Sequence, residues 1–236
     1  MITQNQIINI KMRLERNGNK LSPNSKIIKE YKSTLPMLTQ FQAEVRIGHL
    51  LGDARIESRK SNNGHLLKFE WGDSNKDYAF RSYEIFIDYC LSEPRQQIRT
   101  NKAGNVNTTW CFQTLIHSNF DFLGDFFLDE NKKKRVPIEL FDRGNISPVV
   151  LAYWFMDDGG MNGSHSRGIQ FNTQSFTVEE VDKMINGLNH TYNFNAWRGN
   201  NKGKPVINLP ASVYNEFVNI TKNYIHPSMM HKFRMR

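Results

Sequence analysis

Cysteine is scarce in this chain of 236 residues, which contains only Cys90 and Cys111. Two cysteines cannot build a disulfide framework or a cysteine-based zinc site, so both classes are excluded. Long apolar runs are also missing, because no stretch approaches the ~20 residues that a helix needs to cross a bilayer. We therefore expect no membrane span.

Acidic residues are fewer than basic ones, 23 against 31, which gives a net charge of +8 and a pI near 9.4. This excess favours a polyanionic partner, either nucleic acid or an anionic membrane surface. A hydrophobic content of 39% with 12% aromatics suffices for a packed core and excludes intrinsic disorder. The length fits one large domain or two small ones.

The N-terminal residues 1–22 form a basic extension, with Lys11, Arg13, Arg16 and Lys20. Basic, acid-poor N-termini are typical of transit peptides, although this one is not rich in serine. A basic arm that reaches toward nucleic acid is the alternative, and both remain open.

One pattern of elements occurs twice, with no low-complexity linker between the copies. Each copy opens with a strongly apolar helix, expected over 40–52 and 148–157, and such a helix has to be buried. Ser147 is a favourable N-cap for the second helix and Pro148 occupies its first position. Each helix is followed by an acid and a small residue, Asp53-Ala54 and Asp158-Gly159.

The rest of the pattern repeats as well, in the order helix, two strands, helix, two strands, helix. It predicts an α+β fold of two αββαββα lobes, 23–145 and 146–236, related by a pseudo-two-fold axis. The alternative is a chance match between two unrelated α+β stretches. The expected elements are strands 55–59 and 66–71, helix 78–90, hairpin 97–113 and helix 119–128, then strand 168–174, helix 177–188 with a Thr177–Glu180 capping box, hairpin 195–209 and helix 213–224.

Gly48 and Gly52 are four residues apart, so they share one helical face and allow another helix to approach closely. If that partner is the second apolar helix, Asp53 and Asp158 meet at the helix ends. Two neighbouring carboxylates repel unless a cation lies between them, and oxygen ligands of this kind suit Mg²⁺. Mg²⁺ beside a phosphodiester polarises it and supplies the attacking water.

The repeat also pairs two lysines, Lys134 and Lys232, each close to a proline. They could position the water or offset developing charge. Taken singly, these residues have ordinary explanations: an Asp at a helix end is usually a turn residue, and the run 132–135 could be a solvated basic surface. Their coincidence in a basic, duplicated chain favours a metal-dependent nuclease.

The segments Arg46–Ala54 and Leu151–Gly159 resemble two degenerate copies of the LAGLIDADG motif. The chain resembles the single-chain, double-motif LAGLIDADG homing endonucleases, in particular the omega-type enzymes encoded in mitochondrial large-rRNA group I introns. The resemblance runs over nearly the whole chain from Pro23. Its other segments are Ser22–Lys26, Phe69–Trp71, Asn172–Phe176 and Met229–Lys232.

The resemblance implies a mitochondrial monomer whose motif helices pack at the lobe interface, with two antiparallel sheets forming a saddle over a long DNA target. It implies hydrolysis of both strands across the minor groove, leaving short 3′ overhangs, with two or more Mg²⁺ ions for which Mn²⁺ substitutes. By motif position, Asp53 and Asp158 are the metal-binding acids. Ala54 and Gly159 contribute carbonyls, and Lys134 and Lys232 are the active-site lysines.

The chain departs from the motif at several positions, including Tyr153 where glycine is usual. The Asp157-Asp158 doublet leaves open which acid faces the metal, and alignment with Asp53 favours Asp158. Lys133 competes with Lys134 in the same way, and the spacing to Pro137 favours Lys134.

DNA recognition is expected on the polar faces of the strands, where Arg suits guanine, Asn and Gln suit adenine, and lysines contact phosphates. For any single residue, a plain exposed strand position is the alternative. The candidates are Arg55, Glu57, Arg59, Lys60, Gln97, Arg99, Lys102, Asn107 and Gln113 in the first half, and Gln170, Asn172, Gln174, Arg198, Lys202, Lys204 and Asn208 in the second.

Two other functions use the same scaffold. An intron RNA-splicing maturase would bind RNA, and retention of both acids and both lysines argues against a maturase that has lost cleavage but not against a dual role. A LAGLIDADG-derived transcription regulator would normally carry an added DNA-binding domain, for which this length leaves no room.

Overall fold

The computed structural model describes residues 25–58, 64–142, 144, 146–163 and 166–233. These residues group into two compact units, one from the described parts of 1–39 and 57–122, the other from those of 40–56 and 123–236. Across the described ranges, no helix is long and apolar enough to span a bilayer. The basic extension expected at 1–22 lies outside the described residues.

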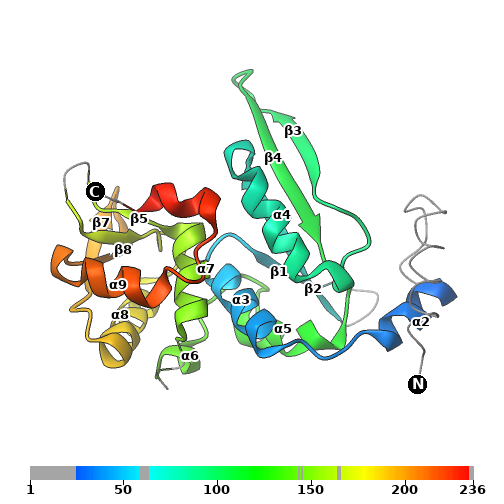
Figure 1. Cartoon of the computed structure of the whole chain (residues 1–236), viewed down its shortest axis with the longest axis horizontal. Helices are drawn as coiled ribbons and strands as arrows, with labels where there is room; N and C mark the ends of the chain where they lie inside the picture. The colour runs from blue at the N-terminus through cyan, green and yellow to red at the C-terminus, as the bar shows by residue number, and fades with distance from the viewer. Residues whose placement is uncertain (1–24, 59–63, 143, 145, 164–165, 234–236) are drawn as a thin grey trace. The chain divides into compact units, whose positions relative to one another are not determined.

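The duplication expected from the sequence is confirmed, because the same order of elements occurs twice (Figure 1). Two four-stranded antiparallel sheets result, with the equivalent strand orders β1-β2-β4-β3 and β5-β6-β8-β7. The first series is α3 (Gln40–Leu51), β1 (Arg55–Ser58), β2 (His65–Gly72), α4 (Lys76–Ile85), β3 (Arg95–Thr100), β4 (Val106–Gln113) and α5 (Asp121–Phe127). The second is α7 (Pro148–Asp158), β5 (Gly159–Met161), β6 (Ile169–Phe171), α8 (Val178–Tyr192), β7 (Trp197–Asn201), β8 (Lys204–Leu209) and α9 (Tyr214–Thr221).

Some elements were not expected from the sequence, namely α2 (Lys26–Thr34), α6 (Ile138–Asp142) and the short β5, and β6 is shorter than the strand expected over 168–174. The compact units also differ from the repeats, because α3 groups with the second unit. The lobe limits 23–145 and 146–236 therefore stay a prediction about the repeat.

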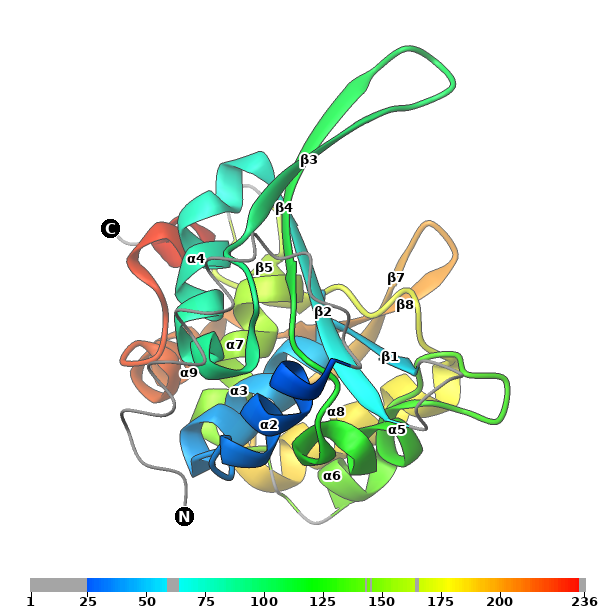
Figure 2. The ribbon, with the colours of Figure 1, turned by 90° about the vertical axis from the view of Figure 1, so that its right-hand side faces the viewer.

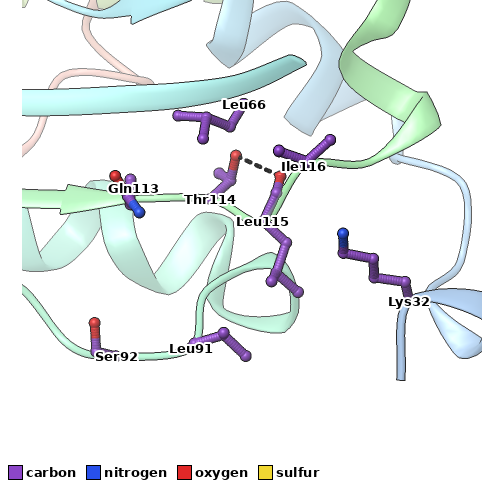
Figure 3. Close-up of a pocket in the computed structure, with 8 residues that line it drawn as sticks. All are labelled: Lys32, Leu66, Leu91, Ser92, Gln113, Thr114, Leu115 and Ile116. Carbon is purple, nitrogen blue, oxygen red and sulfur yellow. Dashed lines mark hydrogen bonds between the residues drawn. The ribbon is translucent and has the colours of Figure 1, made fainter. Parts of the chain in front are cut away.

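The first unit packs α4 against one face of its sheet, as Figures 1 and 2 show. Strand alternation places Phe69 and Trp71 of β2 on this face, where Phe69 stacks on Phe112 with 4.5 Å between ring centroids and Trp71 meets Tyr78 of α4 at 5.2 Å. The opposite face carries the polar residues of the same strands. Near α2, a cavity of about 80 Å³ is lined by the residues drawn in Figure 3, among them Lys32, Leu66 and Leu115.

The second unit is built around α7, whose residues 149–156 are all buried. Trp154 packs on Phe171 of β6 at 4.3 Å between centroids, and Phe155 on Phe217 of α9 at 5.0 Å. The predicted caps are confirmed: Ser147 Oγ accepts from the Val150 amide at 3.2 Å, and Thr177 and Glu180 form a capping box. These contacts fix the residue at which α7 begins. Because the rise per residue of a helix is constant, they also fix the position of Asp158 at its other end.

Candidate functional site

Helices α3 and α7 lie side by side in the second unit (Figure 1), and glycines make their contact close. A Cβ added to Gly48 would lie 2.6 Å from Tyr153 Cβ, and one added to Gly52 would lie 2.3 Å from Asp157 Cβ. Real Cβ atoms do not approach so closely, so only glycine fits at both positions. The close approach predicted from the glycine spacing is confirmed.

The contact brings the acids at the two helix ends together, since Asp53, Asp157 and Asp158 act electrostatically on one another. Asp53 is exposed when the whole residue is considered, but its carboxyl group is largely surrounded by protein. This burial, followed by the charge of Asp157, raises the pKa of Asp53 to about 6. Burial, followed by the charges of Asp53 and Asp157, raises the pKa of Asp158 to about 8. The site therefore concentrates negative charge that a cation would relieve.

Each motif copy anchors one lysine through the backbone carbonyl of its seventh residue. Lys134 Nζ donates to Gly52 O at 2.5 Å and to Ala54 O at 3.1 Å. Lys232 Nζ donates to Asp157 O at 2.8 Å. Burial lowers the pKa of both lysines, that of Lys134 to about 8, and the neighbouring acids oppose this shift. The sequence pairing of these lysines thus corresponds to equivalent contacts in the fold.

The turn before Lys134 separates it from its neighbour in the basic run. Asp129 accepts the Lys133 amide on Oδ1 at 2.8 Å, and Leu128 bridges to Lys134. Lys133 is exposed, whereas Lys134 is partly buried and directed at the end of α3. Of the two candidates, only Lys134 contacts the motif.

The structure also separates the two acids of the doublet. Asp157 Oδ2 accepts from His49 Nδ1 at 2.9 Å and from the Asp53 amide at 3.2 Å. Both the His49 and the Asp157 side chains are 0% exposed. Asp157 is thus used inside the protein, and Asp158 is the acid free of these two contacts. His49 was not singled out from the sequence, because its partner lies 108 residues away.

The donors at this site fit a hard divalent cation, because they are carboxylate and backbone carbonyl oxygens. Within the described ranges, no three His, Cys, Asp or Glu side chains form a ready-made metal cage. Of the two carbonyls expected from the resemblance, that of Ala54 already accepts a bond from Lys134.

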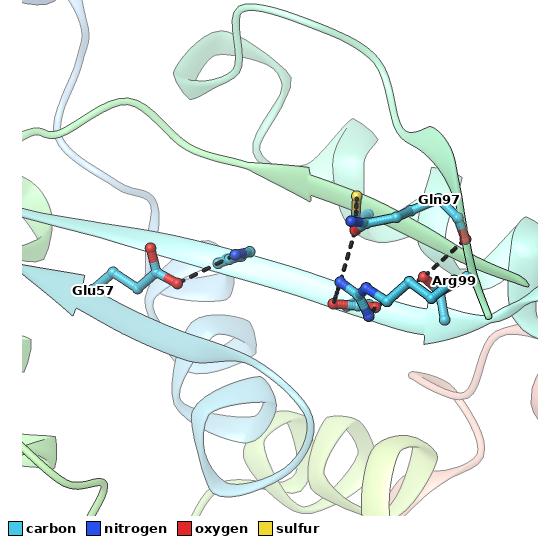
Figure 4. Close-up of polar contacts among 7 residues, drawn as sticks. Glu57, Gln97 and Arg99 are labelled. Atoms are coloured by element: carbon cyan, nitrogen blue, oxygen red, sulfur yellow. Dashed lines mark hydrogen bonds and ion pairs between the residues drawn. The ribbon is translucent and has the colours of Figure 1, made fainter. Parts of the chain in front are cut away.

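The face of the first sheet opposite to α4 carries a polar network, part of which Figure 4 shows. Arg99 pairs with both carboxylate oxygens of Glu70 and donates to Gln97 Oε1 at 2.8 Å, while Thr109 Oγ1 donates to Glu70 at 2.8 Å. On the same face Glu57 pairs with Lys68 at 3.4 Å. Glu70 was not among the predicted site residues, although its place in the strand alternation could have indicated it.

Gln113 and Asn107 lie in register on this same face, and Lys102 is exposed in the hairpin turn. Arg55 is exposed at the start of β1 in the second unit. Arg59 and Lys60 lie outside the described residues.

In the second sheet, the structure brings some of the predicted DNA-binding residues together and separates others. Asn172 Oδ1 accepts from Gln170 at 3.4 Å and from Gln174 at 3.3 Å, which forms an amide cluster. Lys202 and Lys204 are exposed at the β7–β8 turn. Asn208 shares the face of Gln170 but is only 7% exposed and bonds Asn162.

Arg198 lies on the opposite face of the second sheet from this cluster. It is in register with the buried Ile207 and pairs with Asp182 of α8. Alternation along the strand therefore directs it to the helix side of the sheet.

Together, the fold and these contacts define a duplicated α+β protein with two acids and two lysines at adjoining helix ends. The model of the LAGLIDADG DNA endonuclease family matches residues 43–217. The chain is 40% identical over 216 residues to "Probable intron-encoded endonuclease 1" of Wickerhamomyces canadensis, covering 90% of this chain and 92% of the relative.

One structural comparison and one further sequence comparison agree with this. The solved structure of the homing endonuclease I-WcaI bound to its DNA recognition sequence matches with a TM-score of 0.88 and 39% identity, covering 97% of this chain and 99% of that one. The cytochrome b mRNA maturase bI2 of Debaryomyces hansenii is 28% identical over 80% of this chain and 72% of the relative. The chain belongs to the LAGLIDADG DNA endonuclease family.

Proposed function

We propose that the chain is a site-specific homing endonuclease that breaks both strands of a long DNA target by phosphodiester hydrolysis and leaves short 3′ overhangs. The observation that carries this proposal is the meeting of Asp53 and Asp158 at adjoining helix ends, each copy with its own lysine. Family membership and the likeness to an endonuclease solved on its DNA recognition sequence support it.

Asp53 and Asp158 would hold two or more Mg²⁺ ions, for which Mn²⁺ substitutes, with the carbonyls of Ala54 and Gly159 as additional ligands. Bound Mg²⁺ supplies a Lewis acid that polarises the phosphate and lowers the pKa of water. The raised pKa values of both acids support this role, because burial and the neighbouring carboxylates disfavour their charged forms and a bound cation would favour them.

Lys134 would place an amino group near Asp53, and Lys232 would place one near Asp158. Their backbone contacts hold each Nζ close to the end of a motif helix. From there a protonated lysine offsets the charge that develops on the phosphate oxygens, and a neutral one holds the attacking water by a hydrogen bond. Lys134, with its pKa lowered to about 8, is suited to exchange a proton near neutral pH.

DNA recognition would use the polar faces of the two sheets. Arg99 is the best-ordered candidate for a guanine contact, because Glu70 holds its guanidinium. The amide cluster at Asn172 suits adenine, and Lys102, Lys202 and Lys204 suit phosphates. Since a single chain carries both motifs, we propose a monomer. We place it in the mitochondrion on the resemblance and on its cytochrome b maturase relatives.

The test is a cleavage selection: purified chain with Mg²⁺ is incubated with a randomised duplex library, and cut molecules are sequenced. We expect one long preferred site with staggered 3′ ends. Binding of a DNA site that stays uncut with Mg²⁺ and with Mn²⁺ would contradict the proposal.

Likeness to cytochrome b mRNA maturases supports a second function, assistance of intron RNA splicing. A splicing assay on the host intron with the Asp53→Asn variant separates the two, because splicing that survives loss of cleavage shows an independent RNA role.

A further inference from the structure

Among the positions at which the two motif copies differ, the fourth and the seventh bear on the support of Asp53. The fourth residue is His49 in the first copy and Trp154 in the second, and the seventh is Gly52 in the first and Asp157 in the second. The absence of a side chain at Gly52 leaves the space that Asp157 fills, since a Cβ there would lie 2.3 Å from Asp157 Cβ. The interface is therefore asymmetric although the fold is duplicated.

Asp157 and His49 form a hydrogen-bonded pair, termed the Asp157–His49 brace. The brace contacts the backbone amide of Asp53, the acid of the first copy. At the turn after α3, the amide of Gly52 bonds Gly48 O at 3.2 Å and that of Ala54 bonds His49 O at 2.9 Å. The Asp53 amide between them bonds Asp157 Oδ2 instead. A carboxylate accepts, so His49 Nδ1 donates the second bond that orients it.

The ring of His49 is itself held, because it packs edge-on against Tyr153 with 5.1 Å between centroids. The second copy has no counterpart of this arrangement. Asp158 is the last residue of α7, and the following amide, that of Gly159, bonds Phe155 O as in a continuing helix. The seventh residue of the first copy is Gly52, which has no side chain that could accept a hydrogen bond from the amide of Asp158.

Building on the proposed function, we infer that Asp157 and His49 are positioning residues that hold Asp53 in place, and that the two strands of the DNA are cut by unequally supported acids. Asp157 is then not a metal ligand. Loss of the brace displaces Asp53 while Asp158 keeps its helical support, and small displacements of a catalytic group are costly.

The experiment measures the cleavage rate of each strand separately. The full-length chain, saturating and with Mg²⁺, acts on a duplex carrying the site recovered by selection, labelled on one strand at a time. His49→Leu keeps a similar volume but removes the donor, whereas His49→Asn retains an amide donor near the position of Nδ1. Asp157→Asn keeps the size of the side chain and removes its charge. It therefore tests the role of the Asp157–His49 brace even if the His49→Leu variant does not fold.

We expect His49→Leu to change the ratio of the two strand rates by about tenfold, with nicked product accumulating. His49→Asn should return the ratio toward that of the unmodified chain, and Asp157→Asn should change it in the same direction as His49→Leu. DNA binding with Ca²⁺ in place of Mg²⁺ should be unchanged. Equal slowing of both strands, or an equal effect of His49→Leu and His49→Asn, would overturn the inference. An unmodified chain that cuts neither strand would instead overturn the proposed function.

Discussion

Lys134 donates from Nζ to the backbone carbonyl of Gly52 at 2.5 Å, which ties this lysine to the turn that carries Asp53. Lys232 makes the equivalent contact with Asp157 O. Each lysine is therefore held by the backbone of the motif copy it serves.

Replacing Lys134 or Lys232 by Met should lower kcat by about 10²–10³ with little change in DNA affinity, because one donor to the developing charge is lost. Single-turnover cleavage and equilibrium binding measure the two effects separately. Lys133→Met is the matched control, since Lys133 is adjacent but exposed. Equal losses in the Lys133 and Lys134 variants would show that the basic run acts only by its charge.

Asp53→Asn and Asp158→Asn should each abolish double-strand cleavage while binding is retained, because an amide cannot replace a charged metal ligand. Agarose gels of a cut plasmid and filter binding report the two properties. Asp182→Asn, on the exposed surface of α8, should cleave normally. The assignment fails if either site variant still linearises the plasmid at the normal rate.

Without metal, the contribution of Asp53 and Asp158 to folding stability should fall as pH rises from about 4 to 8. The pKa of Asp53 is raised to about 6 and that of Asp158 to about 8, so the folded chain binds more protons than the unfolded chain in this window. The stability that these two acids contribute then decreases with pH. Urea unfolding in EDTA at pH 5, 6.5 and 8 should show a shallower slope for Asp158→Asn. Identical slopes would show that Asp158 titrates normally.

Arg99→Ala should weaken discrimination at one base pair by about 1–3 kcal/mol, because a bidentate contact to a base edge is lost. Lys204→Ala, by contrast, should weaken binding to all sequences and reduce the salt dependence by about one phosphate contact. Binding to single-base variants of the selected site at two salt concentrations distinguishes them. A uniform loss in Arg99→Ala would place Arg99 on a phosphate.

Gly48→Ala should destabilise the chain by about 1–3 kcal/mol, since its Cβ would lie 2.8 Å from the backbone oxygen of Val150, which cannot move aside. Gly72→Ala is the control, because nothing lies within 4 Å of its added Cβ. Thermal melts of both variants check the difference. Equal melting temperatures would mean that α3 and α7 can separate at little cost.

The sequence predicted what depends on local patterns. The caps of α7 and α8, the strand alternation and the two acid-ended helices follow from residues close together in the chain, and the duplication linked the two halves. The short β5 and α6 carry too few residues for a period to show.

What depends on distant contacts was not predictable. Arg198 is a charged residue in a strand, but the register set by the Lys202-Gly203 turn, both at positive φ, places it opposite the buried Ile207. The bond between His49 and Asp157 joins helices 108 residues apart. Neither residue type in isolation indicates such a partner.

The fit between Gly52 and Asp157 has a consequence for engineering. A side chain at position 52 would collide with Asp157, so exchange of a motif helix with that of a relative should succeed only when both residues are transferred together. Libraries designed to change the DNA sequence that is recognised can vary the polar faces of the sheets, provided that α3 and α7 are kept together from one parent protein.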